Sequence, residues 1–540
     1  MQLRDSKQLY LQKKGIIVLL IVFFFLQING HNNQISCEIS KLHPPGLSEF
    51  QNSHKISKIS LAKLSFNKKH QIDLNNFLKD SSFGYVEHSP IFIDGDEDFY
   101  TQAISEGWLG KGTPEDPYII TNYHIKSSLG KLIEIRNTNT YFIISDNLIE
   151  GVYEESDYGI YLENVAHGTI INTIIHTNWC GIWLNSSSYN VIANNTISEN
   201  KDYGIWVANS VNNSIVNNNL FKNGYTRSIP YGGGIFIDSS RFTNFSDNMS
   251  YNNTRGVVLS SGNTINNTIS RNLITNNSLG IDIWRVQYNT IFHNTITNNR
   301  QGIRFQYSTN NLVSNNNIEE NYYAIEVIDG ANNNIITNNT IRMNTYGYDQ
   351  SRVNGSIVSY NTFMWNDYCI HNYIASHNTF TNNILVENSR LGIYLSQGIN
   401  NTFSENIIYN HPSYGIYLLD ADNSFIFYND LIGNGHYFSL GISQAYDGGF
   451  ENTFDYNFWA EWTTPDTDKD GIVDSPYKIA GRANTDSHPL VTPNNLISAD
   501  YLSKYNVIFS IPYQELFLLF TSIDVFLLFF FLITVERRSK

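Results

Sequence analysis

The chain has 540 residues, a net charge of −15 and 15% charged residues, whereas aromatic residues make up 14%. This acidic balance argues against a nucleic-acid partner, and the length allows a large buried core. Amides, hydroxyls and aromatic rings, rather than ions, are therefore expected to dominate the surface.

The first 130 residues predict an export segment, a linker and a cap. Within residues 1–30, two lysines precede the apolar run Gly15–Leu26, which is typical of a signal peptide or signal anchor. Residues 31–87 are polar, contain scattered lysines and show no repeat, so we interpret them as a linker or stalk. Residues 88–130 contain a Gly-, Pro- and Trp-rich segment that is suited to cap the first coil of a solenoid.

A glycine that returns at one register along residues 131–458 indicates a repeat array. It heads strand-like runs such as Gly159-Ile160-Tyr161-Leu162 and recurs after 22 to 30 residues. Such a period predicts a solenoid, in which each coil buries its apolar face against its neighbours. The register is occupied by Gly159, Gly181, Gly204, Gly234, Gly256, Gly280, Gly302, Ala324, Gly347, Cys369, Gly392, Gly415 and Gly441.

Each repeat contains three short apolar runs, separated by Asn, Ser and Gly, and none is long enough for a helix. Alternation with a period of two and a content of Ile, Val and Thr predict β-strands. The fold is therefore expected to be all-β, a right-handed parallel β-helix of about 13–14 coils. A recurring Asn is expected to form a ladder, with its amide bridging successive coils. Its positions are Asn195, Asn218, Asn272, Asn294, Asn316, Asn339, Asn361, Asn383, Asn406 and Asn429.

One side chain of each glycine-headed strand is expected to point outward, so that a stripe runs along the solenoid. Exposed rings stack on the apolar faces of sugars, which favours glycan binding, although aromatic residues are also common in strands that only pack. An insertion within residues 219–233 lies next to the aromatic part of the stripe and is a further candidate for ligand contact. The predicted ligand-binding residues are Tyr161, Trp183, Trp206 and Phe236 in the stripe, and Tyr225, Arg227 and Tyr231 in the insertion.

The middle of the stripe is charged and holds Asp282, Arg304, Glu326 and Asp349 on successive coils. Paired carboxylates could perform acid and base steps on glycosides. Alternatively, a carboxylate-held calcium with Arg304 as base could support a lyase reaction. The simpler interpretation is a ladder in which neighbouring charges neutralise each other. These four residues are therefore candidates, and no catalytic residue is assigned.

Residues 459–495 are expected to cap the other end and contain an aspartate-rich loop. Asp466, Asp468, Asp470 and Asp474 match the first part of a calcium-binding loop. The bidentate Glu of a complete loop is replaced by Tyr477. We therefore predict either a structural calcium site or a metal-free carboxylate turn.

The C-terminal region predicts a membrane anchor. A juxtamembrane segment, 496–515, leads into the 20-residue apolar stretch 516–535, and the tail 536–540 contains three basic residues. This length fits a bilayer span, and the basic residues favour the cytoplasmic side. We expect a single-pass protein of the cell membrane, with the solenoid outside and the C-terminus in the cytoplasm.

The glycine-headed coils, the Gly107–Ile120 entry and the Trp459–Tyr477 exit resemble right-handed β-helices of the NosD and CASH type, as found in archaeal surface proteins of the pectate-lyase-like superfamily. The resemblance covers about residues 88–492. It implies the fold, because this superfamily includes polysaccharide lyases, hydrolases, epimerases and non-enzymatic binders. The NosD name implies a role with copper, but the 4 Met, 3 Cys and 14 His form no cluster in the sequence. We expect neither copper nor an organic cofactor.

These observations favour an extracellular, membrane-anchored β-helix that binds polysaccharide or surface glycan through its aromatic stripe. One alternative is a polysaccharide lyase or glycoside hydrolase that uses the Asp/Arg/Glu ladder. Another is a structural spacer or adhesin, in which the stripe contacts other cell-surface proteins.

Overall fold

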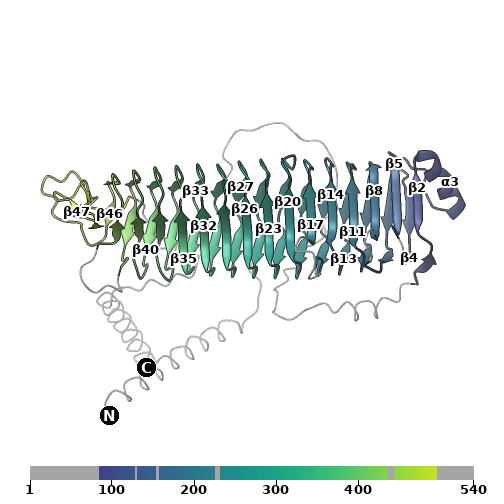
Figure 1. The fold of residues 1–540 in the computed structure, drawn as a ribbon, viewed down its shortest axis with the longest axis horizontal. Coiled ribbons are helices and arrows are strands. Elements are labelled where there is room, and N and C mark those ends of the chain that lie inside the picture. Colours follow the sequence, from purple (N-terminus) through teal and green to yellow (C-terminus); the bar gives the residue numbers. More distant parts are fainter. Residues whose placement is uncertain (1–83, 128–129, 154–156, 225–231, 436–442, 495–540) are drawn as a thin grey trace, which may run out of the picture. The chain divides into compact units, whose positions relative to one another are not determined.

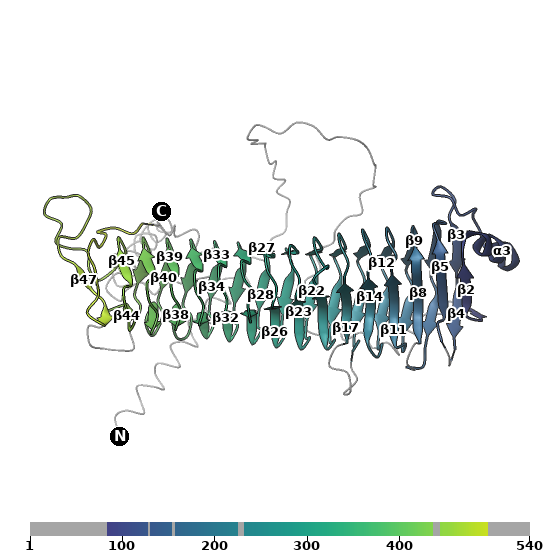
Figure 2. The same ribbon diagram turned by 45° about the horizontal axis from the view of Figure 1, so that its top comes forward.

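The computed structural model describes residues 84–127, 130–153, 157–224, 232–435 and 443–494. Within them, short strands stack coil upon coil along one axis (Figure 1 and Figure 2). The three strands of a coil belong to three different sheets, named A, B and C, and strands three apart in sequence pair in parallel. The predicted parallel β-solenoid is confirmed.

Sheet A contains 16 strands, most of them three residues long with a buried apolar residue at the centre. Its strands are β1 (Val86–His88), β4 (Tyr123–Lys126), β7 (Leu148–Glu150), β10 (Ile174–His176), β13 (Thr196–Ser198), β16 (Asn219–Phe221), β19 (Met249–Tyr251), β22 (Leu273–Thr275), β25 (Thr295–Thr297), β28 (Asn317–Glu319), β31 (Thr340–Arg342), β34 (Thr362–Met364), β37 (Ile384–Val386), β40 (Ile407–Tyr409), β43 (Asp430–Ile432) and β46 (Phe458–Trp459).

Sheet B also contains 16 strands and is built from the glycine-headed runs. Many of its strands are six residues long, so it offers a wider outer face than the other sheets. Its strands are β2 (Ile91–Asp94), β5 (Ile133–Thr138), β8 (Tyr158–Val165), β11 (Cys180–Asn185), β14 (Tyr203–Ala208), β17 (Gly233–Asp238), β20 (Arg255–Ser260), β23 (Leu279–Trp284), β26 (Gln301–Gln306), β29 (Tyr323–Ile328), β32 (Tyr346–Ser351), β35 (Tyr368–Tyr373), β38 (Ile393–Ser396), β41 (Ile416–Leu419), β44 (Ala445–Asp447) and β48 (Ala480–Gly481).

Sheet C completes each coil, and at its C-terminal end β49 pairs in parallel with β45 and antiparallel with β47. Its strands are β3 (Tyr118–Thr121), β6 (Phe142–Ser145), β9 (Gly168–Ile171), β12 (Val191–Ala193), β15 (Ser214–Val216), β18 (Asn244–Ser246), β21 (Thr268–Ser270), β24 (Thr290–Phe292), β27 (Leu312–Ser314), β30 (Ile335–Thr337), β33 (Ile357–Ser359), β36 (Thr379–Thr381), β39 (Thr402–Ser404), β42 (Phe425–Phe427), β45 (Thr453–Asp455), β47 (Tyr477–Lys478) and β49 (Thr485–Asp486).

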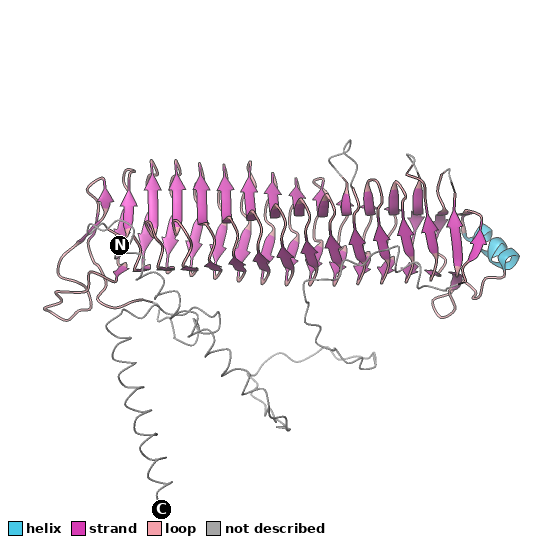
Figure 3. Cartoon of the chain, turned by 90° about the horizontal axis from the view of Figure 1, so that it is seen from below, coloured by secondary structure: helices cyan, strands magenta, loops and turns pink. Residues whose placement is uncertain are grey.

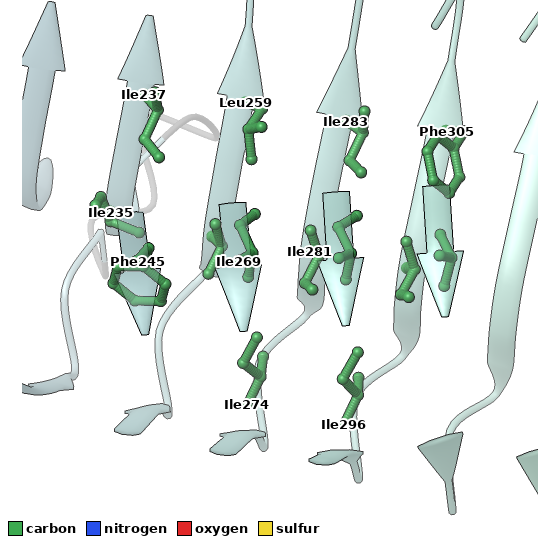
Figure 4. Close-up of a cluster of buried hydrophobic side chains, with 14 of the residues drawn as sticks. Ile235, Ile237, Phe245, Leu259, Ile269, Ile274, Ile281, Ile283, Ile296 and Phe305 are labelled. Atoms are coloured by element: carbon green, nitrogen blue, oxygen red, sulfur yellow. The ribbon is translucent and has the colours of Figure 1, made fainter. Parts of the chain in front are cut away.

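The core is a set of apolar columns that run along the axis inside the three sheets. In one coil, Ile281 and Ile283 of β23, Ile291 of β24 and Ile296 of β25 are completely buried. Figure 4 shows equivalent side chains of neighbouring coils stacked at the same height on their strands. Full burial of such a side chain stabilises the fold by about 1.5–3 kcal/mol, and every coil repeats the contribution.

Asparagine ladders hold successive coils together at the corners. The side-chain oxygen of Asn316 accepts hydrogen bonds from the backbone N–H and the amide of Asn294, at 2.9 and 3.0 Å. The Asn316 amide donates to the carbonyl of Ile291. This ladder, predicted from sequence, is accompanied by two more. The second contains Asn178, Asn200, Asn223, Asn253, Asn277, Asn299, Asn321, Asn344, Asn366 and Asn388, and the third contains Asn190, Asn213, Asn267, Asn289, Asn311, Asn334, Asn378 and Asn401.

The repeated glycine is required by a close approach between coils. A Cβ on Gly181 would lie 2.6 Å from the carbonyl oxygen of Gly204, and one on Gly256 would lie 2.5 Å from that of Gly280. None of the register glycines in the described part of the chain has a positive φ. Glycine therefore recurs at this position because a side chain would collide with the next strand, and not because the backbone is left-handed.

Helix α3 (Asp96–Glu106) covers one end of the solenoid (Figure 3). Its Phe99 is completely buried and stacks on Tyr118 at a ring-centroid distance of 5.2 Å. Strands β1 to β4 lie within or next to the segment assigned to the cap, residues 88–130, and pair with later strands of the sheets. The repeat array therefore extends into that segment.

The C-terminal end is closed by an aromatic pair. Trp459 is completely buried and stacks on Tyr477 with ring centroids 4.0 Å apart. The indole of Trp459 and the amide of Asn457 both donate to the buried Asp486. Asp486 thus ends the first asparagine ladder with a carboxylate in place of an amide oxygen.

The predicted signal, linker, juxtamembrane segment, membrane span and tail lie outside the described residues. In the described part of the chain, no helix has the length and the apolar character needed to cross a membrane.

Candidate functional site

The outer side of sheet B, which we call the B face, carries a continuous column of side chains. Residues of adjacent strands are paired in register from Tyr161 on β8 to Tyr446 on β44. This central column consists of Tyr161, Trp183, Trp206, Phe236, Val258, Asp282, Arg304, Glu326, Asp349, His371, Tyr394, Tyr417 and Tyr446. The structure therefore brings the stripe residues predicted from sequence onto one line.

The central column is less exposed than the sequence indicated. Most of its members are half-buried, and Tyr161, Val258 and Asp282 have exposed fractions of 4%, 2% and 1%. The reason is a second column, three residues earlier in each strand, whose side chains pack against the first. For example, the rings of Tyr158 and Tyr161 contact each other at a centroid distance of 5.8 Å. We call this second set the flanking column.

The N-terminal third of the B face is an aromatic cluster. Trp183 stacks on Trp206 at 4.7 Å and 13°, and Tyr203 stacks on Phe236 at 4.8 Å. Because coils are about 4.8 Å apart, rings at one register stack on one another. Their faces are therefore largely covered by neighbouring rings, and their edges point away from the sheet. The indole N–H groups of both tryptophans are buried without a hydrogen-bond partner among the described residues, which packing alone does not explain.

The C-terminal third repeats this arrangement with tyrosines. In the flanking column, Tyr346 stacks on Tyr323 and on Tyr368, both at 4.8 Å. In the central column, Tyr417 stacks on Tyr394 at 5.8 Å and on Tyr446 at 4.6 Å. Burial raises the pKa of Tyr323 to about 12, with added repulsion from nearby carboxylates. Its hydroxyl therefore keeps its proton and can donate a hydrogen bond at neutral pH.

Between these aromatic regions, Asp282 is held by two arginines. Arg255 of the flanking column lies 3.0 Å from one carboxylate oxygen of Asp282, and Arg304 contacts the other oxygen through Nε at 3.0 Å and Nη2 at 2.9 Å. Opposite charges surround this buried carboxylate, as expected for a neutralising ladder. Because Arg304 is bound to Asp282 in this way, the arrangement does not favour it as the base of a lyase.

Glu326 and Asp349 form a different arrangement, with two carboxylates at paired positions of adjacent strands. Within the described residues, no lysine or arginine lies within ion-pair distance of either carboxylate. Glu326 accepts a hydrogen bond from Gln301, and Asp349 contacts Nδ1 of His371 at 2.6 Å. Burial raises the pKa of Glu326 to about 7, and the charge of Asp349 adds to this shift. The self-neutralising ladder predicted from sequence therefore describes Asp282 but not this pair.

Three residues of this site were missed in the sequence: Arg255, Tyr323 and His371. Arg255 and Tyr323 precede the central position by three residues, an odd spacing that strict alternation assigns to the opposite face. His371 lies in the central column itself, where the register could have identified it.

The three insertion residues predicted to bind ligand, Tyr225, Arg227 and Tyr231, lie outside the described residues. The structure describes both ends of the insertion, because Gly224 donates to the carbonyl of Asn200 and Gly233 to that of Asp202. The insertion therefore leaves and re-enters the solenoid beside β14 and β17, next to the aromatic cluster.

The aspartate-rich loop brings three carboxylates together. Ligand atoms of Asp466, Asp468 and Asp470 lie within 4.8 Å of one another, the only such group among the described residues. These oxygen donors suit a calcium ion. Asp474 instead accepts hydrogen bonds from the backbone N–H and the hydroxyl of Thr467, at 2.9 and 2.7 Å. It therefore shapes the turn in this structure.

Comparison with protein families gives two matches. The family described as "Right handed beta helix region" matches residues 110–272 and 348–458, which together exceed half of the chain. The chain belongs to this right-handed β-helix family. A second family, "Periplasmic copper-binding protein (NosD)", matches residues 227–354. Within that range the sequence offers His293, Met249 and Met343 as soft or imidazole ligands, and they lie on different coils.

Solved structures resemble the chain only distantly, and no curated protein matches it. The Dettilon tailspike protein is 16% identical, covers 69% of this chain and 67% of its own, and has a TM-score of 0.37. The mannuronan C-5 epimerase AlgE4 A-module of Azotobacter vinelandii is 13% identical, with 65% and 87% coverage and a TM-score of 0.31. The tailspike of E. coli bacteriophage HK620, solved in complex with a hexasaccharide, is 10% identical, with 66% and 73% coverage and a TM-score of 0.40.

Proposed function

We propose that this β-helix binds a linear polysaccharide along the B face. The observation that supports the proposal is the central column, a half-buried line of rings and polar groups that continues from coil to coil. A polymer lying along the axis meets an equivalent position on every coil, so many weak contacts add along its length.

The stacking of the rings suggests how sugars would be held. Because the ring faces are covered by neighbouring rings, ring edges and tyrosine hydroxyls, rather than whole ring faces, would contact the ligand. The raised pKa values of Tyr323 and Tyr417 keep these hydroxyls protonated as donors. Sugar hydroxyls are suitable acceptors and donors for such groups.

The proposed setting is the outside of the cell membrane. The apolar stretch 516–535 is proposed to anchor the chain, with the solenoid extending from the membrane. A calcium ion bound by Asp466, Asp468 and Asp470 is proposed to stabilise the C-terminal cap. Both proposals rest on sequence, and the second also on the grouping of these carboxylates.

Retention of the full-length protein on immobilised polysaccharides tests the binding proposal. Trp183→Ala and Trp206→Ala should each weaken retention about tenfold, which corresponds to about 1.4 kcal/mol. Trp365→Ala is a matched control, because its half-buried indole donates to Glu387 away from the B face.

The outcomes separate the alternatives. Equal loss in all three variants would point to a general packing effect and contradict the proposal. Wild-type protein that retains no polysaccharide, but captures a cell-surface protein through the B face, would favour a spacer or adhesin.

A further inference from the structure

The adjacent carboxylates Glu326 and Asp349 lie in the middle of the proposed binding face. They occupy paired positions on β29 and β32, so their strands are about 4.8 Å apart. Like charges at paired positions of a sheet destabilise it, and no lysine or arginine of the described residues lies within ion-pair distance of either carboxylate. In a column with a purely structural role, we would expect each carboxylate to have a basic partner. Asp282 is an example, because Arg255 and Arg304 contact its carboxylate.

The two carboxylates have different environments. Glu326 accepts a hydrogen bond from Gln301 and lies next to Arg304, which is bound to Asp282. Asp349 contacts His371 through Oδ1, whereas Oδ2 has no hydrogen-bond partner among the described residues. His371 is itself fixed by stacking on Tyr394 at 5.0 Å and 4°. Glu326 is therefore suited to hold a proton, whereas Asp349 has one oxygen that makes no hydrogen bond within the described residues.

We propose that Glu326 and Asp349 hydrolyse a glycosidic bond of the bound polysaccharide, with Glu326 as general acid and Asp349 as nucleophile. This inference rests on the proposed polysaccharide binding and adds a reaction to it. Carboxyl groups about 5–5.5 Å apart are typical of glycosidases that retain the anomeric configuration, whereas inverting enzymes need a wider gap for water. Glu326 and Asp349 are paired on adjacent strands about 4.8 Å apart, a spacing that allows the carboxyl separation of the retaining type.

The reaction would proceed in two balanced steps. In the first, Glu326 donates its proton to the glycosidic oxygen as the C1–O bond breaks, and Oδ2 of Asp349 forms a bond to C1. In the second, water attacks C1, its proton passes to Glu326, and the bond between C1 and Oδ2 breaks. Both carboxyl groups return to their starting states, and no other reactant is required.

The surroundings fit this assignment. Tyr323 and Tyr346 of the flanking column begin the strands that carry Glu326 and Asp349, so their hydroxyls would contact sugar hydroxyls near the scissile bond. Burial raises the pKa of Glu326 most, Asp349 of β32 raises it further, and Arg304 and Gln301 of β26, together with Arg300, lower it. His371 acts as a positioning residue, because it contacts Asp349 and not the reacting bond.

The test uses the full-length protein with β-glucan, xylan, galactomannan and hyaluronate. For each polymer, both retention and new reducing ends are measured. Wild-type protein should release reducing ends from a polymer that it retains, whereas Glu326→Gln and Asp349→Asn should reduce release at least a hundredfold and preserve retention. Asp247→Asn is the matched control, because that carboxylate pairs with Arg271 at an exposed turn outside the B face.

Three results would overturn the inference. Retention without new reducing ends would refute hydrolysis and leave the binding proposal intact, whereas absence of retention on all four polymers would refute both. A lower unfolding temperature in both carboxylate variants would assign the pair a structural role, since removal of like-charge repulsion should leave that temperature unchanged or raise it.

The stereochemistry of the product provides a further check on Asp349. The anomer released first, followed by NMR, should have the configuration of the substrate. Release of the inverted anomer would refute Asp349 as the nucleophile.

Discussion

At the scale of single residues, the B face gives the two acidic side chains Asp282 and Glu326 opposite electrostatic surroundings. Asp282 is the more deeply buried, yet two arginines contact its oxygens. Glu326 is less buried but shares its surroundings with another carboxylate. Burial is the main cause that raises the pKa of Glu326, and the charge of Asp349 adds to it, whereas Arg304 lowers it. Asp349 and Arg304 lie one coil away from Glu326 rather than nearby in sequence.

This difference predicts how stability depends on pH. Burial raises the folded-state pKa of Glu326 to about 7, above the ordinary glutamate pKa of 4.5. Between these values the folded state binds more protons than the unfolded state, so stability falls as the pH rises through 7 and levels off about one unit above it. We expect the free energy of unfolding to fall by about 1–3 kcal/mol over this pH range, after allowance for solvent screening.

Urea unfolding at pH 5 and pH 8 measures this effect. The wild type should lose more stability over this range than Glu326→Gln, which carries no titratable group at that position. The comparison with the variant is needed because burial also raises the pKa of Asp202, to about 6, and adds to the wild-type slope. An equal loss of stability between pH 5 and pH 8 in the two proteins would show that the pKa of Glu326 is not raised.

At the scale of elements, the strands are too short to be stable alone, and the asparagine ladders tie each coil to the next. Asn316 is buried and takes part in bonds to Asn294, Asn339 and two backbone carbonyls. Asn316→Ala leaves several of these buried groups unpaired, at about 1–3 kcal/mol for each unsatisfied group. We therefore expect a loss of about 2–4 kcal/mol in total.

The neighbouring residue supplies the control for this prediction. Asn315 is exposed and has a φ of 55°, a conformation that glycine adopts readily. Asn315→Gly should change the unfolding free energy by only a few tenths of a kcal/mol. A similar loss in both variants, measured by urea unfolding, would contradict a specific role of the ladder.

The sequence predicted the fold well because one period repeats in every coil. The glycine register, one asparagine ladder and the central column all follow from counting residues. The second and third ladders were missed; the third is interrupted by Thr243 and Ser356, which weakens the pattern. The burial of the column could not be predicted, because residues three apart, such as Tyr158 and Tyr161, pack against each other on one face, which strict alternation does not anticipate.

At the scale of the whole molecule, a solenoid gains stability from contacts between neighbouring coils, so its two ends are its weakest points. The N-terminal end is covered by α3, whose Phe99 is buried against Tyr118. The C-terminal end depends on Trp459, Tyr477 and the aspartate-rich loop. Because unfolding can begin at an unprotected end, small changes in this cap should affect the whole array.

Calcium provides a direct test of this cap. A loop of this kind outside the cell typically binds calcium with a Kd of about 10⁻⁴–10⁻³ M. At ten times the Kd, binding stabilises the folded cap by about 1.4 kcal/mol. Adding calcium to the full-length protein should therefore raise its calorimetric unfolding temperature, and a chelator should reverse the increase. Asp468→Asn should abolish the response, whereas Asp247→Asn should preserve it. An unfolding temperature that does not change with calcium would assign Asp466, Asp468 and Asp470 to a turn that needs no metal.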